Sequence, residues 1–360
     1  MKLSEIVQRI NGNIDRFTTE LEFYIGGEHM ESSELEISNR GLLKENLGKL
    51  GFKFHFAFQE RDVLFMARNP HLRKAGMVMF SGLCSDATYV LRSKDENIIS
   101  QEFLAIQLQT DHFWDYCERT KVGSVNFANN WSSIANYDFD LPPINIQKEV
   151  ASKVWSAYRV KQSYRKLLNA IDEMVKSQFI EMFGGHSKVV KLKDVVTIMD
   201  DKRKPINEGE RSAMKDGELY PYYGATGVVD YINDYLTDER VLCIAEDCGN
   251  YGPGEESSYI IEGKAWVNNH AHVVKPNDEL CDITYLHNYL KVTDLLPFVS
   301  GTTRKKLTQK AMSDLDIILP QIDKQREYVS ICDQADKSKF ELKKSIEAID
   351  KVIKSLINSI

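Results

Sequence analysis

The loop Gly301-Thr302-Thr303-Arg304-Lys305-Lys306 has a composition suited to a phosphate-bearing ligand. Its glycine lets a backbone approach the ligand closely, its threonines offer hydroxyl donors, and its three cations suit phosphate oxygens. Arg304 could also donate to the O6 and N7 acceptors of guanine. The loop therefore favours nucleic-acid contact, although a solvated basic turn would carry the same residues.

Three other segments carry groups suited to bases. Residues 220–227, Tyr-Pro-Tyr-Tyr-Gly-Ala-Thr-Gly, place three tyrosines beside a glycine turn, which suits core packing as well as a DNA-facing loop. Asn268-Asn269-His270 offers amides of the kind that pair with adenine N6 and N7. In the first half, residues 68–74, Arg-Asn-Pro-His-Leu-Arg-Lys, form a similar basic loop with an amide.

Familiar catalytic motifs are missing from the sequence. It has no Gly-x-x-x-x-Gly-Lys-Ser/Thr phosphate loop, no Gly-x-Ser-x-Gly elbow, no His-Glu-x-x-His and no Asp/Asn-Pro-Pro-aromatic motif. His270 and His272 would share one strand face and could bind a metal, but no third ligand stands at a recognisable spacing. Asp200-Asp201 and Glu246-Asp247 could hold Mg²⁺ in a nuclease, yet no lysine completes a familiar pattern. We therefore predict no catalytic residue and no metal site.

The elements that must position these loops occur twice. Residues 138–180 and 316–358, aligned without a gap at an offset of 178, are identical at 15 of 43 positions. The offset extends upstream to Gly123-Ser124 and Gly301-Thr302. The chain is therefore predicted to contain two copies of one unit, each a mixed globular region followed by a long helix.

Each predicted helix begins after a proline and contains neither proline nor glycine, over residues 144–183 and 321–360. Asn145 and Asp323 are expected to be the N-caps. About 38 residues at about 1.5 Å each give a rod of about 57 Å, longer than a domain of this size is wide. We expect the two rods to pack antiparallel on each other, the alternative being a helix packed only on its own globular region.

A heptad pattern supports the pairing. Apolar residues recur in alternating steps of four and three in both helices, and a lysine interrupts the pattern at equivalent positions, 161 and 339. The predicted seam residues include Val154, Tyr164, Leu168, Ile171, Val175, Cys332, Leu342, Ile346, Ile349 and Ile353.

Composition limits the remaining possibilities. With 360 residues and a net charge of −7, the chain is not a globally basic nucleic-acid binder, but a local basic face remains possible. Its six scattered cysteines form no C-x-x-C pair, and it has no membrane-length apolar run or signal-peptide core, so we expect a cytoplasmic protein. Both globular regions are expected to be α+β, with strands near 62–68, 87–91, 241–245 and 270–274 and helices at 100–119 and 282–292. The sequence is expected to divide into two globular regions, 1–141 and 185–319, each followed by a segment with a long helix, 142–184 and 320–360.

Together these residues resemble the specificity (S) subunit of type I restriction–modification systems. The resemblance covers nearly the whole chain and rests on the duplication, the paired helices and short motifs. These motifs are Tyr24-Ile25-Gly26-Gly27-Glu28-His29, Asp62-Val63-Leu64-Phe65, Leu141-Pro142-Pro143, residues 222–227, residues 267–272, residues 300–305, and Leu319-Pro320 leading to Gln325.

The resemblance implies a DNA-binding subunit without catalytic activity of its own. Residues 1–141 and 185–319 would be target recognition domains that read the halves of a split, asymmetric target, and the helices would form a coiled-coil spacer. Two methyltransferase (M) subunits, carrying S-adenosylmethionine, would assemble around it and methylate adenine, with or without two restriction (R) subunits. The side chains expected to contact double-stranded DNA are Arg68, Asn69, Lys74, Asn126, Tyr223, Thr226, Asn268, His270, Thr303, Arg304 and Lys305.

The first half departs from the second in two respects. It has Gly123-Ser124-Val125-Asn126-Phe127 where the second half has its cationic loop, so we expect Arg68 and Lys74 to supply the positive charge. It also shows no obvious counterpart of residues 222–227. The two halves should then read different sequences. A self-contained nuclease or methyltransferase with an unfamiliar motif, and a coiled-coil adaptor that binds no nucleic acid, are the alternative functions.

Overall fold

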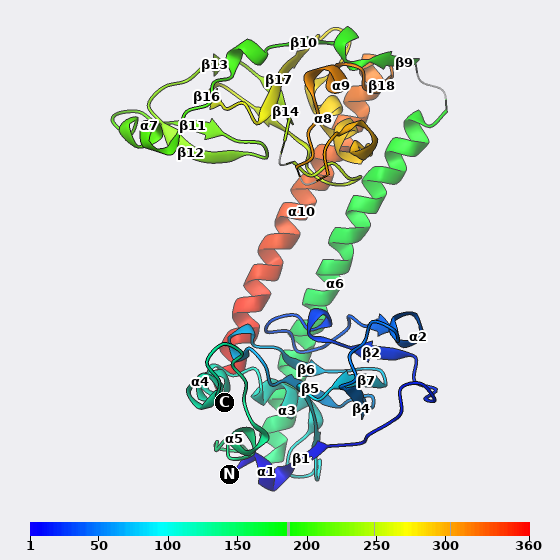
Figure 1. Ribbon diagram of the computed structural model, residues 1–360, viewed down its shortest axis with the longest axis vertical. Coiled ribbons are helices and arrows are strands. Elements are labelled where there is room, and N and C mark those ends of the chain that lie inside the picture. The colour runs from blue at the N-terminus through cyan, green and yellow to red at the C-terminus, as the bar shows by residue number, and fades with distance from the viewer. Residues whose placement is uncertain (186–187, 248, 303) are drawn as a thin grey trace. The chain divides into compact units, whose positions relative to one another are not determined.

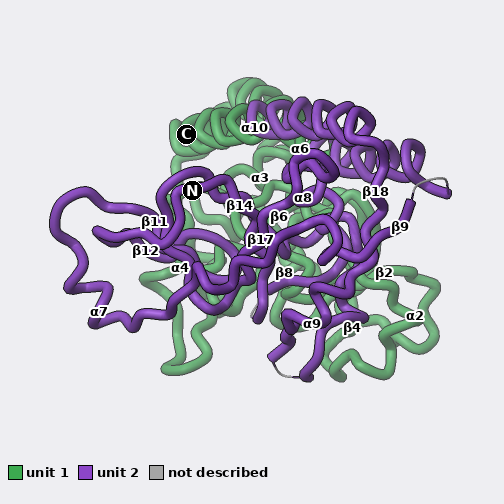
Figure 2. Tube along the Cα trace, turned by 90° about the horizontal axis from the view of Figure 1, so that it is seen from above, with its two compact units in different colours: residues 1–166, 343–360 green, residues 167–342 purple. Residues whose placement is uncertain are grey.

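The computed structural model of the chain describes residues 1–185, 188–247, 249–302 and 304–360. It divides into two compact units (Figure 2): unit 1 comprises residues 1–166 and 343–360, and unit 2 comprises residues 167–342. Both units mix helices and strands, which confirms the predicted α+β class. A search of the described ranges finds no helix capable of spanning a bilayer.

The elements are labelled in Figure 1. Up to the first long helix they are α1 (Leu3–Ile6), β1 (Val7–Ile10), β2 (Phe23–Ile25), β3 (Gly41–Leu42), α2 (Leu43–Asn46), β4 (Phe54–Phe58), β5 (Val63–Met66), β6 (Ala75–Met77), β7 (Gly82–Ser85), β8 (Thr88–Ser93), α3 (Gln101–Gln107), α4 (Asp111–Thr120), α5 (Trp131–Ala135) and α6 (Ile144–Phe183). After it come β9 (Lys188–Lys191), β10 (Val196–Ile198), α7 (Glu208–Ala213), β11 (Tyr220–Tyr223), β12 (Val228–Ile232), β13 (Thr237–Asp238), β14 (Val241–Ala245), β15 (Ser258–Ile261), β16 (Lys264–Val267), β17 (Ala271–Pro276), α8 (Ile283–Val292), α9 (Gln309–Ser313), β18 (Asp316–Leu319) and α10 (Ile322–Ile357).

The sheets of the two units have the same topology. Unit 1 contains the strand orders β1-β8-β5-β6 and β3-β2-β7-β4, and unit 2 contains β10-β17-β14-β15 and β12-β11-β16-β13. In each unit the second of these sheets includes one parallel pair, β2 with β7 and β11 with β16. Each strand of these four-stranded sheets thus has a counterpart in the other unit at the same place in the sheet, which confirms the internal repeat; unit 2 adds the two-stranded sheet β18-β9.

The long helices pair antiparallel within each unit. In unit 1, Val154 of α6 shares a hydrophobic core with Ile353 of α10, and Lys161 contacts Asp350 at 2.7 Å. The residue number therefore rises along α6 as it falls along α10. Figure 1 labels both helices.

The same direction is found in unit 2. The ring of Phe183 in α6 lies 5.6 Å from that of Tyr328 in α10, and Lys339 contacts Asp172 at 3.1 Å. The antiparallel pairing predicted from the heptads is therefore confirmed in both units. The alternative, a helix that packs on its own globular region, also holds in part. In each unit, residues of α6 and α10 pack on the hydrophobic core of the globular region.

The predicted seam residues avoid solvent. Val154, Cys332 and Ile353 are buried, and the other seven are half-buried. A two-helix seam is open along both sides, so partial exposure is what this geometry gives.

Two sequence predictions were wrong in detail. The helices begin at Ile144 and Ile322, one residue before the predicted caps Asn145 and Asp323, which therefore lie inside the first turn. The predicted helix 100–119 is two helices, because the hydroxyl of Thr110 accepts the backbone N–H of Phe113 and starts a new helix there.

A buried glutamine fastens the start of each long helix. Gln147 accepts the N–H of Ser100, the N-cap of α3, at 3.2 Å and donates to the carbonyls of Ile98 and Pro142, both at 2.8 Å.

Gln325 makes the equivalent bonds in unit 2. It accepts the N–H of Asp282, the N-cap of α8, and donates to the carbonyls of Leu280 and Pro320. Both glutamines are 0 % exposed, so the two units share this joint between helix and globular region.

Candidate nucleic-acid interface

The predicted cationic loop of unit 2 is a tight turn closed by backbone hydrogen bonds. The N–H of Ser300 donates to the carbonyl of Lys306 at 2.9 Å, and the reverse bond is 2.8 Å; we call this segment loop 300–306. Gly301 has φ +88°, and a Cβ there would collide with the carbonyl oxygen of Arg304, so the turn requires glycine. Thr303, predicted to contact DNA, lies outside the described residues.

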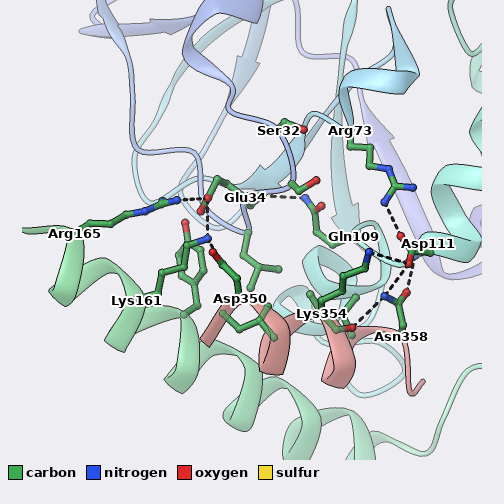
Figure 3. A pocket seen from close by; sticks show the side chains of 15 residues that line it. Ser32, Glu34, Arg73, Gln109, Asp111, Lys161, Arg165, Asp350, Lys354 and Asn358 are labelled. Carbon is green, nitrogen blue, oxygen red and sulfur yellow. Dashed lines mark hydrogen bonds and ion pairs between the residues drawn. The ribbon is translucent and has the colours of Figure 1, made fainter. Parts of the chain in front are cut away.

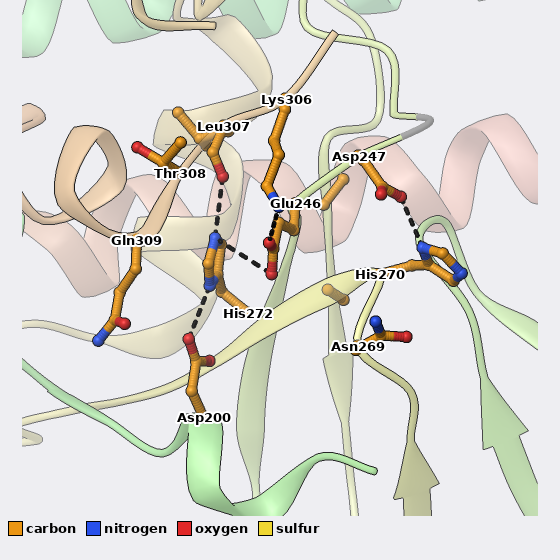
Figure 4. Close-up of polar contacts among 12 residues, drawn as sticks. Asp200, Glu246, Asp247, Asn269, His270, His272, Lys306, Leu307, Thr308 and Gln309 are labelled. Carbon is orange, nitrogen blue, oxygen red and sulfur yellow. Dashed lines mark hydrogen bonds and ion pairs between the residues drawn. The ribbon is translucent and has the colours of Figure 1, made fainter. Parts of the chain in front are cut away.

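Asp247 contacts two predicted DNA-binding residues, and Figure 4 shows its contact with one of them, His270. Its carboxylate contacts the guanidinium of Arg304 at 2.9 Å and Nδ1 of His270 at 2.6 Å. Asp247 follows β14 and His270 precedes β17, so the paired ends of two central strands carry this group. The Arg304 side chain is still 61 % exposed and can reach a ligand.

His272 belongs to a neighbouring, more buried network. Its Nδ1 contacts Asp200 at 2.8 Å and its Nε2 contacts the carbonyl of Leu307 at 2.9 Å. His270 and His272 are thus held by different carboxylates, and the structure does not support the metal pair considered from the sequence. Across the described ranges, no group of three or more His, Cys, Asp and Glu side chains is placed to hold a metal ion.

Two carboxylates of this network bind cations of the same unit. Burial raises the pKa of Asp200, but hydrogen bonds from His272 and the Val273 N–H outweigh it and the pKa is lowered overall. Burial likewise raises the pKa of Glu246, and Lys306 and Arg203 bring it below its ordinary value. Both groups are therefore ionised and neutralise Lys306 and Arg203.

Two residues inside loop 300–306, Arg304 and Lys305, carry positive charge that faces solvent. Lys306 lies 2.8 Å from Glu246, whereas Lys305 is exposed and has no ion-pair partner among the described residues. Arg304 and Lys305 are the cations that this loop presents to a ligand.

The aromatic segment of unit 2 is mostly structural. The Tyr223 ring stacks on that of Tyr259 at 5.2 Å, and the carbonyl of Tyr223 accepts the N–H of Asn268 at 3.1 Å. Asn268 is 7 % exposed and its Oδ1 accepts the N–H of His270, so its amide shapes the turn before β17. Within this set Thr226, in the turn between β11 and β12, is the exposed residue.

Unit 1 contains the same turn at the predicted offset. Val122 and Ala128 exchange backbone hydrogen bonds of 2.8 and 3.0 Å and define loop 122–128. Gly123 has φ +106°, and a Cβ would lie 2.6 Å from the carbonyl oxygen of Asn126, which matches the place of Gly301 and Arg304 in the other loop.

The strand beside each turn is also equivalent. Arg68 forms an antiparallel bridge with Ala128 in unit 1, as Asp247 does with Lys306 in unit 2. The structure therefore gives Asn126 and Arg304 the same backbone position.

The predicted basic segment 68–74 is only partly at this loop. Arg68 is exposed beside it, and Asn69, also exposed, adopts φ +53° and donates its N–H to the carbonyl of Phe127 at 2.8 Å. Lys74 is half-buried, and its ammonium donates to the carbonyl of Gly27 at 2.7 Å. The positive charge beside loop 122–128 therefore comes from Arg68, and Lys74 is occupied elsewhere.

Unit 1 does have a counterpart of the segment 222–227, contrary to the sequence prediction. β2 pairs parallel with β7 as β11 pairs with β16, and Gly26 follows β2 as Gly224 follows β11. The two segments share Tyr24 with Tyr222 and Gly26 with Gly224, a match that the strand pairing makes visible.

Sequence analysis also missed a group of charged residues in unit 1. They line a pocket of about 310 Å³ (Figure 3), where Glu34 contacts Lys161 at 2.9 Å and Arg165 at 2.8 Å. Lys161 was noticed only as an interruption of the heptads. The usable signal was that Lys161 and Asp350 recur as Lys339 and Asp172 at the offset of 178.

The comparisons with known proteins all point to the same family. A family model described as the type I restriction modification DNA specificity domain matches residues 1–172 and 185–350. A putative type I restriction enzyme specificity subunit of Haemophilus influenzae, S.HindORF215P, is 34 % identical over 145 residues. That match covers 39 % of this chain and 35 % of the relative, so the chain spans about a third of the length of the curated relative it matches.

Two solved structures share the fold. One, from work on the complex assembly and conformational transition of the type I R-M system, has a TM-score of 0.58 at 16 % identity and covers 99 % of this chain and 96 % of that one. The other, a type I restriction-modification S subunit from M. genitalium, has a TM-score of 0.56 at 13 % identity and covers 99 % and 94 %. Because the family model matches most of the sequence, this chain belongs to the family of type I restriction modification DNA specificity domains and carries two of them.

Proposed function

We propose that this chain is the DNA-specificity subunit of a type I restriction–modification complex and reads a bipartite, asymmetric target. Residues 1–141 and 185–319 would serve as its two target recognition domains. The observation that carries the proposal is the pair of equivalent loops, 122–128 and 300–306, which share a backbone and differ in their exposed side chains. Two readers with one scaffold and different contact groups suit a target whose halves differ in sequence.

The partners follow from the proposed role. Two M subunits that carry S-adenosylmethionine would assemble on this chain in the cytoplasm and methylate adenine, and R subunits would join them in a system that also cleaves DNA. The chain itself would bind DNA and hold these subunits without a cofactor or catalytic residue of its own.

The long helices α6 and α10, with the predicted spacer segments 142–184 and 320–360, would set the distance between the half-sites. An added heptad lengthens a helix by about 10.5 Å, close to three base pairs at about 3.4 Å each. Because α6 and α10 pair antiparallel, a heptad inserted in both, after Leu168 and after Ile346, keeps the seam in register.

The test is the methylation motif of the chain reconstituted with its M subunit. We expect the double insertion to add about three base pairs between the half-sites and to leave both half-sites unchanged. A seven-residue insertion at the exposed Gly51 is the control and should change nothing. Unchanged spacing with a functional complex would remove the role of the helices, and a chain that methylates or cleaves DNA alone, or that binds no DNA even at low salt, would overturn the proposed function.

A further inference from the structure

Loops 122–128 and 300–306 have equivalent exposed backbone turns and carry different side chains. In loop 300–306 the exposed residues at and after the turn include Arg304 and Lys305. In loop 122–128 the exposed residues 123–126 are Gly, Ser, Val and Asn and carry no charge. A loop without cations cannot bind phosphates by charge, and it lacks the guanidinium that recognises guanine.

Two side chains remain for contact in loop 122–128. Val125 is 83 % exposed, so its isopropyl group has almost no neighbours in unit 1. Asn126, at the backbone position of Arg304, presents an amide with one donor and one acceptor group. An apolar group fits the methyl of thymine, and an asparagine amide fits N6 and N7 of adenine.

A residue beside loop 122–128 supplies the positive charge that the loop itself lacks. Arg68 is exposed on the adjoining strand and bridges to Ala128 through its backbone, which leaves its guanidinium available for a phosphate. Lys121 is not available in the same way, because its ammonium lies 2.5 Å from Glu118 and over the ring of Phe127. Arg68 would therefore position the duplex while Val125 and Asn126 contact base edges.

We propose that loop 122–128 reads an A·T base pair, with Asn126 hydrogen-bonded to adenine and Val125 against a thymine methyl, whereas Arg304 reads a guanine. This inference rests on the proposed function and adds to it the class of base that each unit recognises. It follows that the half-site of unit 1 contains an A·T pair where the half-site of unit 2 contains a G·C pair.

The experiment determines the methylation motif of the M-subunit complex by sequencing, for the wild type and for matched variants. Asn126→Arg should replace the preferred adenine at one position of one half-site by guanine, with a change in preference of about tenfold or more, and should leave the other half-site unchanged. Val125→Ser should weaken the preference for the neighbouring A·T pair in that same half-site. Arg304→Asn should relax a guanine in the opposite half-site, which assigns each half-site to its unit.

Ser124→Ala in the same loop is the control and should preserve the motif. Because residues 124–126 are exposed, these variants are expected to fold. An active complex whose motif is the same in the wild type, Asn126→Arg and Val125→Ser overturns this inference and leaves the proposed function in place. A wild-type complex that methylates no DNA overturns both.

Discussion

The two units hold their long helices together with the same ion pair in different surroundings. Lys161 contacts Asp350 in unit 1, and Lys339 contacts Asp172 in unit 2, at the offset of 178 in both residues. In unit 1 the globular region adds Glu34, which binds Lys161, and the Lys161 side chain is 7 % exposed. In unit 2 Lys339 finds its other carboxylate, Asp336, one turn earlier on its own helix and is 18 % exposed.

This difference separates what the helices specify from what the globular regions add. The lysine–aspartate contact lies entirely within the repeated helices, so duplication preserved it. Glu34 comes from the segment before β3, where the two units have diverged in sequence. Burial raises the pKa of Glu34, but hydrogen bonds from Arg165 and Lys161 lower it overall, so unit 1 encloses an ionised carboxylate beside its lysine–aspartate contact.

The joint that the units share should be the most costly to break. Gln147→Ala and Gln325→Ala each remove a fully buried side chain and leave one N–H and two carbonyls without their present partners, in surroundings that are buried or half-buried. At about 1–3 kcal/mol for each unpaired buried group, we expect each substitution to destabilise its own unit by about 4 kcal/mol. Hydrogen–deuterium exchange would measure the loss of protection in α3 for the first variant and in α8 for the second.

Gln334→Ala is the matched control, since Gln334 is exposed on α10, and it should change the stability by less than about 0.5 kcal/mol. Loss of protection in one unit only, after both glutamine substitutions, would contradict the equivalence of the two joints.

The lysines should behave differently in the two units. Lys161→Met leaves Glu34, a buried carboxylate, with Arg165 as its remaining cation, and we expect a loss of about 3 kcal/mol in unit 1. Lys339→Met leaves Asp172 and Asp336, which are more than half exposed and keep their hydration, so the loss should be close to zero.

Chemical denaturation of the two variants, with protection from exchange read in each unit, measures this contrast. The double variant Lys161→Met/Glu34→Leu is the control, because it removes both buried charges and should recover most of the loss. Equal losses for the two lysines would show that Glu34 contributes nothing to the burial of charge in unit 1.

A half-buried histidine should make unit 2 more sensitive to mild acid. His287 in α8 contacts the hydroxyl of Ser258 at 2.9 Å, and burial, assisted by Lys291, lowers its pKa from the ordinary 6.5. The folded state therefore binds its proton less readily than the unfolded state, so stability falls as the pH drops below about 6.5, by at most about 1.4 kcal/mol per pH unit. The equivalent position in unit 1 is Ala105, which cannot titrate.

Thermal unfolding between pH 7 and pH 5 tests this asymmetry. His287→Ala should have a shallower dependence of Tm on pH than the wild type, whereas His71→Ala, at an exposed position of unit 1, should keep the wild-type slope. A parallel pH dependence for the wild type and His287→Ala would rule out this histidine as the source.

The parts predicted well from sequence were those with local periodicity. The proline before residue 144 and the glycine after residue 183 predicted the observed ends of α6, Ile144 and Phe183, and the repeat paired loop 122–128 with loop 300–306. Both signals depend on residues close together in the chain or on identity at a fixed offset.

Contacts between residues far apart in the sequence could not be predicted, because no local pattern indicates which partner a side chain meets. Nothing near Glu34 in the sequence indicates that it meets Lys161, 127 residues away, and Lys74 gave no sign that its ammonium would bind the carbonyl of Gly27. The match between β2 and β11 was missed because the segments share only Tyr24 with Tyr222 and Gly26 with Gly224, and the strand pairing is what aligns them.

The smallest expected effect concerns the charge that distinguishes the two loops. Lys305→Ala removes an exposed cation without an ion-pair partner among the described residues, so the stability of unit 2 should stay within about 0.5 kcal/mol. If Lys305 contacts a phosphate, the slope of log K against log salt for DNA binding should become less steep by about 0.9. Lys351→Ala, exposed on α10, is the control and should preserve the slope. An unchanged slope for Lys305→Ala would mean that Lys305 contacts no phosphate, and the two other cations of the loop, Arg304 and Lys306, are both ion-paired within unit 2.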